Sequence, residues 1–434
     1  MLHSSFSRTS FKPLWNADSG LRLSPFVSPP AFRFLSCRTP SQKYFNKSKR
    51  LRHPSRTSTS FNWTLESMED LGDITRLSKH VVRVLGQNPG KFTLQGTNTY
   101  IIGSQNPYIL IDTGEGLPEY TPVLSKALTT LSAPTIPSLP DVSDIIISHW
   151  HFDHVGGIPS VLILLKELWE NRNPGAPYVP PRLHKYLIGD ALKGEHNSHY
   201  FRLPKLIREL SKELYTAAPN GDAFHDLQEG QIIKEPSGAV LLRVLHTPGH
   251  TVDSICLHVP QDRALYTADT VLGHGTAVFE DLATYLASLN KMLHFGTPAA
   301  TAPSDSGFDI QQDVDLEYVT LYPAHGAVIA NGRETIATYI KHRLEREAQI
   351  LGVLKSSIPA ELLNSGVQAA YWTTWNIVRV IYKAYPENLW LPAARGIDLH
   401  LTKLEGEGIV KRVGGEGTET EWKVLVSPPS TPNL

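Results

Sequence analysis

Residues 149–154 read His-Trp-His-Phe-Asp-His, and they constrain this chain more than any other segment. They follow the segment Asp-Ile-Ile-Ile at 144–147, which predicts a short buried strand, and they precede a pair of glycines. Histidines at positions i and i+2 of an extended segment project to the same side, and the next turn can bring Asp153 and His154 beside them. Imidazole and carboxylate groups together suit zinc and related metals. One catalytic zinc needs only three protein ligands, so four candidates in this run indicate two metals.

Three further candidate ligands stand where predicted strands end. They are His250, Asp269 and His325, after the predicted strands 239–245, 264–266 and 318–322. We expect all three at one edge of a sheet, where seven ligands can serve two zinc ions that share one carboxylate. A lone histidine is more often a surface or core residue than a ligand. For that reason four others receive no role: His246, His258, His274 and His294.

The rest of the body contains strand-like and helix-like segments. Further strands are predicted at 80–85, 97–102, 108–111 and 254–259, and helices at 120–131, 158–170, 203–215 and 334–354. Residues 171–223 otherwise carry loop signals, and the segment 296–315, rich in Pro, Ser, Ala, Gly and Asp, predicts an inserted surface loop. Near the C-terminus, helices at 372–384 and 391–404 precede a hairpin of 409–413 and 421–425. This order predicts a winged-helix-like unit.

Composition bounds the class of protein. The chain is 41% hydrophobic and 19% charged, which is typical of a globular protein and not of a disordered or fibrous one. No stretch approaches the roughly 18 to 20 apolar residues that a membrane span needs, so no membrane is expected as a partner. The two cysteines, Cys37 and Cys256, exclude a disulfide scaffold and a zinc site built from cysteines alone.

The charge is distributed unevenly along the chain. Residues 1–60 hold 11 Lys and Arg residues and one acid, Asp18, and they are rich in Ser and Pro. This composition fits a mitochondrial transit peptide, a disordered tail or a start codon placed too early. We therefore expect a leader at 1–75, a catalytic domain at 76–340, a C-terminal unit at 341–425 and a tail at 426–434. Without the first 60 residues the chain has 30 basic and 41 acidic residues, a formal charge of −11.

Together these motifs resemble the metallo-β-lactamase superfamily, whose signature is HxHxDH. Over residues 76–425 the chain is similar to the β-lactamase-like protein 2 group of that superfamily, which includes fungal thioesterases of the atrochrysone carboxyl carrier-protein type. The runs 92–100, 272–282 and 382–389 support this resemblance. Ala268 and Ala324 depart from the family, which usually has glycine at those positions.

The resemblance implies an α/β fold, the αβ/βα sandwich, with two zinc ions at the sheet edge. By family role, one zinc is held by His149, His151 and His250, and the other by Asp153, His154 and His325, with Asp269 bridging. Asp112 is expected to orient a ligand histidine from behind. Asp153 is also a candidate catalytic residue that shuttles protons for a metal-activated hydroxide.

The metal ligands do not choose the substrate, so two hypotheses stay open. The first is a thioesterase that releases an acyl or polyketide chain from the acyl carrier protein of a polyketide synthase, or that cleaves a small thioester. The second is a single-strand endoribonuclease of mitochondrial type, which the leader favours. The charge opposes RNA, because residues 341–434 hold 11 basic and 10 acidic residues and lack a basic footprint. The first hypothesis fits a cytoplasmic protein, and the second a mitochondrial one.

Overall fold

The computed structural model of the chain describes residues 69–130, 135–189, 202–238, 240–297, 316–362 and 371–425. All of them belong to one unit of the chain, Trp63–Leu434. Three predicted segments lie wholly or partly outside the described residues and remain predictions. They are the leader 1–75, as far as residue 68, the insert 296–315, from residue 298, and the tail 426–434. None of the helices in the described ranges has the length and apolar composition that a membrane span requires.

Within these ranges a first sheet has seven strands in sequence order. They are β1 (Ile74–Arg76), β2 (Val81–Leu85), β3 (Asn98–Ile102), β4 (Tyr108–Ile111), β5 (Val142–Ile147), β6 (Arg182–Lys185) and β7 (Phe224–Asp226). Each pair of neighbours from β1 to β4 is antiparallel, and each pair from β4 to β7 is parallel. Leu110 packs toward the outer helices, whereas Ile109 and Ile111 pack against the second sheet. Both faces of this sheet are therefore buried, as its nearly continuous apolar runs predict.

The second sheet, as far as the structure describes it, has five strands in the order β12-β11-β10-β9-β8. They are β8 (Ile232–Lys234), β9 (Leu241–His246), β10 (Ile255–Val259), β11 (Ala264–Ala268) and β12 (Thr320–Pro323). Only β11 and β12 pair in parallel, and the other pairs are antiparallel. An apolar cluster with side chains from both sheets fills the space between them, including Ile111, Leu242 and Tyr266.

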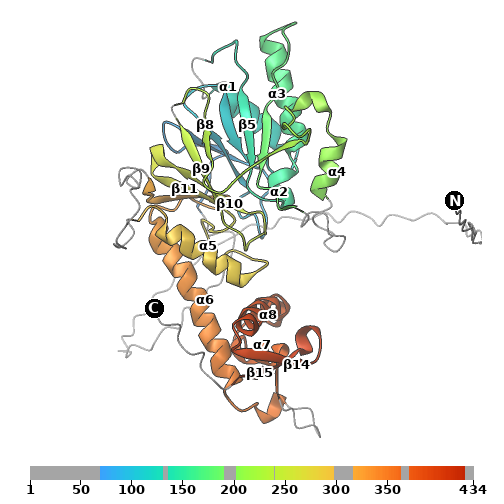
Figure 1. Ribbon diagram of the computed structural model, residues 1–434, viewed down its shortest axis with the longest axis vertical. Helices are drawn as coiled ribbons and strands as arrows, with labels where there is room; N and C mark the ends of the chain where they lie inside the picture. The colour runs from blue at the N-terminus through green and yellow to red at the C-terminus, as the bar shows by residue number, and fades with distance from the viewer. Residues whose placement is uncertain are drawn as a thin grey trace, which may run out of the picture. The chain divides into compact units, whose positions relative to one another are not determined.

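Helices cover the outer face of each sheet (Figure 1). The first sheet packs against α1 (Tyr120–Thr130) and α3 (Ile158–Arg172), and the second against α5 (Leu282–His294) and α6 (Gly332–Leu354). Two shorter helices, α2 (Phe152–Val155) and α4 (Arg202–Glu209), lie beside each other in Figure 1. The predicted αβ/βα sandwich is confirmed.

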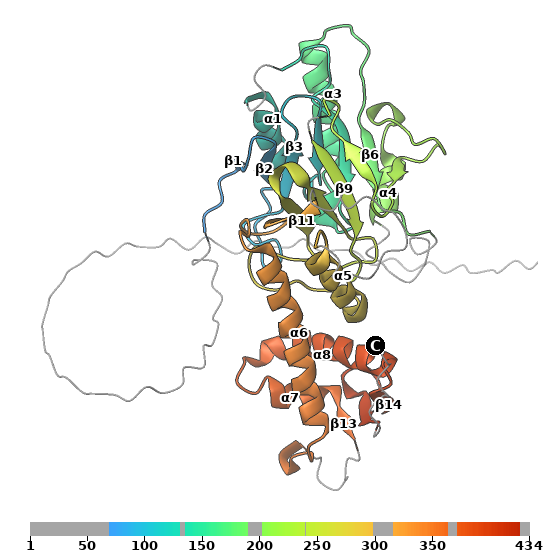
Figure 2. The ribbon, with the colours of Figure 1, turned by 60° about the vertical axis from the view of Figure 1, so that its left-hand side comes forward.

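The C-terminal part has its own core. A small sheet of β13 (Trp372–Thr373), β15 (Glu421–Val424) and β14 (Val410–Gly414) packs with α7 (Thr374–Ile381) and α8 (Trp390–Gly406). The predicted winged-helix unit is confirmed. Helix α6 runs without a break through the predicted boundary at residues 340 and 341. Figure 2 shows one end of α6 beside α5 and its other end beside α7 and α8. Ile336 lies in the core of the second sheet, whereas Ile350 lies in the C-terminal core.

The structure corrects two predicted helices. The helix expected from residue 372 begins at Thr374, because the Thr373 hydroxyl caps it by accepting from the Asn376 N–H and Trp372 pairs with Trp422 in the small sheet. The helix predicted over 203–215 ends at Glu209, and Ser211 has an extended backbone before a short 3-10 turn at Lys212–Leu214. The strands β6 to β8 were not predicted, since these three or four residues contain no apolar run like that of the four-residue strand β4.

Candidate metal centre

The structure brings the seven predicted ligands together in two adjacent groups. The first contains His149, His151, His250 and Asp269, and the second contains Asp153, His154 and His325; within each group the ligand atoms lie within 4.8 Å of one another. The four histidines that received no role lie in neither group of the described chain. Four loops from different parts of the sequence therefore meet at one sheet edge.

In the first group three imidazole nitrogens converge. The Nε2 atom of His250 lies 2.9 Å from His151 Nδ1 and 3.2 Å from His149 Nε2, and the last two atoms are 2.9 Å apart. Burial lowers the pKa of His149 well below its usual range, and burial together with the nearby His250 lowers the pKa of His151 to about 3. Neutral imidazoles that turn their ring nitrogens to one point are suited to hold a cation.

The second group mixes carboxylates with histidines. The Oδ2 atom of Asp153 lies 3.2 Å from His154 Nε2 and 3.3 Å from His325 Nε2. Burial disfavours the charged imidazoles, but the carboxylates of Asp153 and Asp112 outweigh it and raise the pKa of His154 well above normal. Asp269 and Asp153 likewise raise the pKa of His325 to about 9. The surrounding negative charge makes this group attractive to cations.

Asp269 contacts both groups through different oxygens. Its Oδ2 atom lies 3.5 Å from His250 Nε2, whereas its Oδ1 atom lies 3.2 Å from His325 Nε2 and 3.5 Å from His154 Nε2. Among the described residues, the buried atoms His154 Nε2 and Asp269 Oδ1 have no hydrogen-bond partner. Such orphaned atoms need an explanation, and a metal ion coordinated by both groups supplies one. The donor set fits two zinc-like ions with Asp269 between them.

Asp112 lies behind the second group. Its Oδ2 atom is 2.8 Å from His154 Nδ1, accepts from the Ser148 hydroxyl at 2.8 Å and accepts from the Tyr266 hydroxyl at 2.5 Å. The Ser148 N–H donates to Oδ1. The carboxylate is fully buried, and by bonding Nδ1 it fixes the ring so that His154 Nε2 faces the other ligands. This is the position that we expected for a residue that orients a ligand.

Two strand ends at the site have unusual backbone conformations. Asp112 follows β4 with a φ of 59°, and Ala268 ends β11, directly before Asp269, with a φ of 47°. Aspartate tolerates this left-handed region better than alanine does. The glycine that the family usually has in place of Ala268 is thus explained by the turn that delivers Asp269.

His250 is delivered by the turn between β9 and β10, which approaches α5 closely. Gly249 has a φ of 128°, and a Cβ atom placed on it would lie 2.3 Å from the Tyr285 Cα. The Nδ1 atom of His250 lies 2.7 Å from the Val278 carbonyl oxygen, which leaves Nε2 for the first group. Only glycine therefore fits beside α5 while His250 points into the site.

We expect Gly249→Ala to displace His250 and to lower metal content and activity together, because the new methyl group meets backbone that cannot move aside. Metal analysis of the purified variant measures this. The matched control is Gly221→Ala, at a φ of 87° with nothing within 4 Å of the added Cβ. It should lose about 1 kcal/mol of stability from the backbone conformation alone and keep its metal. Equal metal content in the two variants would contradict the close-packing argument.

Sequence reasoning missed several residues that support the ligands. The Thr97 hydroxyl donates to Asp153 Oδ2 at 3.0 Å. The Asn98 amide donates to the carbonyl oxygens of Pro323 and Gly326, on either side of His325. Thr97 and Asn98 lie in the run 92–100, where the sequence predicts a strand and a family resemblance but no contact with the ligands. That run marks where the first sheet holds the loop that carries His325.

A buried ion pair also lies beside the first group. Lys185, at the end of β6, donates to Asp253 Oδ2, and both side chains are fully buried. The other oxygen of Asp253 accepts from the Thr251 hydroxyl at 2.7 Å. The pair therefore ties the first sheet to the turn that follows His250. No sequence pattern pointed to it.

The comparisons with known proteins agree with this geometry. Residues 92–325 match the model of the metallo-beta-lactamase superfamily, and residues 373–422 match that of the beta-lactamase associated winged helix domain. The chain is 34% identical over 336 residues to the Beta-lactamase-like protein 2 homolog of Drosophila melanogaster, covering 77% of this chain and 91% of the relative. It is 32% identical over 286 residues to an Atrochrysone carboxyl ACP thioesterase of Claviceps purpurea (strain 20.1), covering 66% and 69%.

The fold is also found among solved structures. A beta-lactamase domain protein from Burkholderia ambifaria superimposes with a TM-score of 0.52 at 19% identity, over 81% of this chain and 93% of that one. At this identity the likeness concerns the fold alone.

Proposed function

Since the chain belongs to the metallo-β-lactamase superfamily, we propose that it is a dinuclear zinc hydrolase that cleaves thioesters of an acyl carrier protein. The observation that carries the hydrolase class is the contact of one carboxylate, Asp269, with both groups of ligands. Paired zinc ions supply an acidified water and polarise the carbonyl under attack. The proposal needs no serine or cysteine nucleophile.

In this proposal each side chain has a distinct task. His149, His151 and His250 would hold one zinc ion, and Asp153, His154 and His325 would hold the other, with Asp269 available to both. The Asp153 side chain is 21% exposed, compared with 12% for Asp269, 2% for His325 and none for His154. Asp153 is therefore the carboxylate best placed to exchange a proton with solvent during turnover. Asp112 keeps His154 oriented.

Charge and relatives support a thioester over RNA. The body of the chain has a formal charge of −11 without the first 60 residues, which disfavours a polyphosphate substrate. Trp372 of the winged-helix unit is buried and donates to the Ser356 carbonyl oxygen, so it is not available to stack a base. The relative from Claviceps purpurea bears the name of an ACP thioesterase.

We expect metal removal to abolish hydrolysis of an acyl thioester and stoichiometric zinc to restore it. Removal of the ions withdraws the acidified water, whose pKa falls from 15.7 to about 7 on zinc. The assay follows thiol release from an acyl N-acetylcysteamine thioester, with single-stranded RNA as a parallel substrate. Thioester cleavage that survives complete metal removal would exclude the mechanism. Zinc-dependent cleavage of RNA alone would favour the endoribonuclease hypothesis instead.

A further inference from the structure

A groove lies against the loop that carries the metal ligands. It has a volume of about 430 Å³ and separates α2 from α4. Its apolar lining comes from Phe152, Pro159, Leu206 and Leu210, and three charged side chains also line it: Arg202, Lys205 and Glu209. Phe152 stands between the ligands His151 and Asp153 in the sequence, so the loop that carries these ligands also lines the groove.

The outer wall of the groove is basic on a chain whose body is acidic. Residues 202–215 carry the cations Arg202, Lys205, Arg208 and Lys212, all exposed, and only two acids, Glu209 and Glu213. On α4 the first three cations are spaced by three residues, which places them along one side of the helix. Both acids have cationic partners: Glu209 lies 3.9 Å from Lys205, and Glu213 lies 2.8 Å from Lys166. This surface therefore presents a local excess of positive charge.

The basic helix is coupled to the ligand loop. The Arg202 guanidinium lies over the Phe152 ring, 5.0 Å from its centroid. A cation held against an aromatic face keeps its outer edge free for an anion. An anionic group bound on α4 would thus lie one side chain away from the loop that bears His151 and Asp153.

We propose that α4 and this groove form the docking site for an acidic carrier protein, with the phosphopantetheine arm lying in the groove. This inference rests on the proposed function and names the partner of that site. The cations match the acidic surface and the phosphate of such a carrier, and the apolar lining matches the uncharged arm. A single-stranded RNA would use several stacking platforms, whereas this groove contributes one aromatic ring, which Arg202 already covers.

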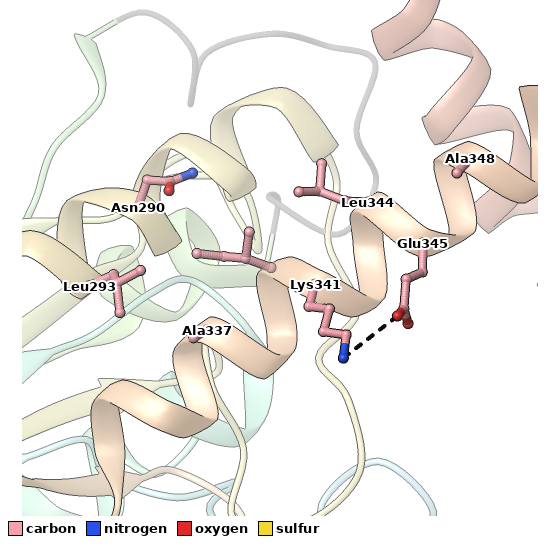
Figure 3. Close-up of a pocket in the computed structure, with 8 residues that line it drawn as sticks. Asn290, Leu293, Ala337, Lys341, Leu344, Glu345 and Ala348 are labelled. Atoms are coloured by element: carbon pink, nitrogen blue, oxygen red, sulfur yellow. Dashed lines mark ion pairs between the residues drawn. The ribbon is translucent and has the colours of Figure 1, made fainter.

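The test compares two charge reversals at closely matched lysines. Lys205 is 71% exposed and lies 3.9 Å from Glu209 on the next turn; Lys341 on α6 is 72% exposed and lies 3.9 Å from Glu345. Figure 3 shows Lys341 and its ion pair on the wall of another groove, far along the chain from α4. Lys205→Glu and Lys341→Glu therefore change the same charge in the same local setting, on different helices.

The substrates carry one acyl group, either on an acidic holo carrier protein or on N-acetylcysteamine. We expect Lys205→Glu to lower the ratio of kcat/KM for the carrier to that for the small thioester at least about tenfold, through KM, because like charges repel across the interface. Lys341→Glu should leave the ratio at its original value. The variant Lys205→Arg keeps the positive charge and should keep the original ratio. It therefore separates the effect of charge from that of side-chain packing. An unchanged ratio in Lys205→Glu, or an equal fall in both variants, overturns the proposal.

Failure of the proposed function can be told apart from failure of this inference. If neither thioester is hydrolysed, binding of the holo carrier protein to full-length protein is measured by calorimetry, with RNA of matched charge as competitor. Binding that Lys205→Glu weakens and Lys341→Glu preserves supports the docking site even then. No binding of the carrier, or binding of RNA alone that depends on Lys205, refutes it.

Discussion

Replacement of Asp269 by alanine should release metal from both groups of ligands and lower kcat/KM by at least about 10³-fold, the scale on which metal-activated water contributes to hydrolysis. The reason is its position: Oδ2 contacts His250 in one group, and Oδ1 contacts His154 and His325 in the other. A ligand of one group alone should affect mainly one ion. The measurement is metal content per chain by mass spectrometry beside thioester turnover.

The control for this variant is an aspartate at the other end of the same strand, β11. Asp262 precedes β11, at the end opposite to Asp269, and accepts from the Tyr322 hydroxyl at 2.8 Å. Asp262→Ala removes a carboxylate and a hydrogen bond but touches no ligand. It should keep the metal and lose about 1 kcal/mol of stability. Full metal content in a folded Asp269→Ala protein would show that Asp269 does not hold the two groups together.

Replacement of Lys185 by methionine should destabilise the protein by about 3 to 5 kcal/mol, because it leaves the charge of Asp253 buried without a partner. Both side chains are fully buried, so water cannot compensate the carboxylate. Urea unfolding, followed by tryptophan fluorescence, measures the loss as a shift of the midpoint at constant slope.

Two comparisons distinguish the buried charge from the lost contact. The double variant Lys185→Met with Asp253→Asn removes both charges and should recover at least about 2 kcal/mol of the loss. Lys291→Met breaks an exposed pair with Glu229, whose side chains are 38% and 49% exposed, and should cost below about 1 kcal/mol. A double variant as unstable as Lys185→Met would mean that packing, not charge, explains the effect.

The ligands could be predicted from the sequence because each carries a local signal. His149 to His154 follow a buried strand directly, and His250, Asp269 and His325 each follow a strand of their own. Strand ends converge on one sheet edge in any such sandwich, so spacing alone indicated their proximity. The segments 158–170 and 334–354 were also predicted as helices, and they correspond to α3 and α6.

The residues that support the ligands carry no such signal. Lys185 and Asp253 are 68 positions apart, and they pair only because β6 packs beside the turn that precedes β10. Thr97 and Asn98 read as an ordinary strand, and their contacts to Asp153 and to the carbonyls beside His325 depend on the facing of two sheets. The strands β6, β7 and β8 were missed because each mixes polar with apolar residues over only three or four positions, whereas the four residues of the predicted strand β4 are all apolar.

The unbroken helix α6 connects two hydrophobic cores, and its length fixes the rotation of one core relative to the other about the helix axis. Ile336 is anchored in one of them and Ile350 in the other. Each residue of an α-helix adds about 100° of rotation and 1.5 Å of rise. One residue inserted between them would therefore turn the winged-helix core by more than a quarter of a circle, whereas an insertion of seven would nearly restore its facing. Length variation in this family should thus be tolerated in α6 only in steps close to whole turns.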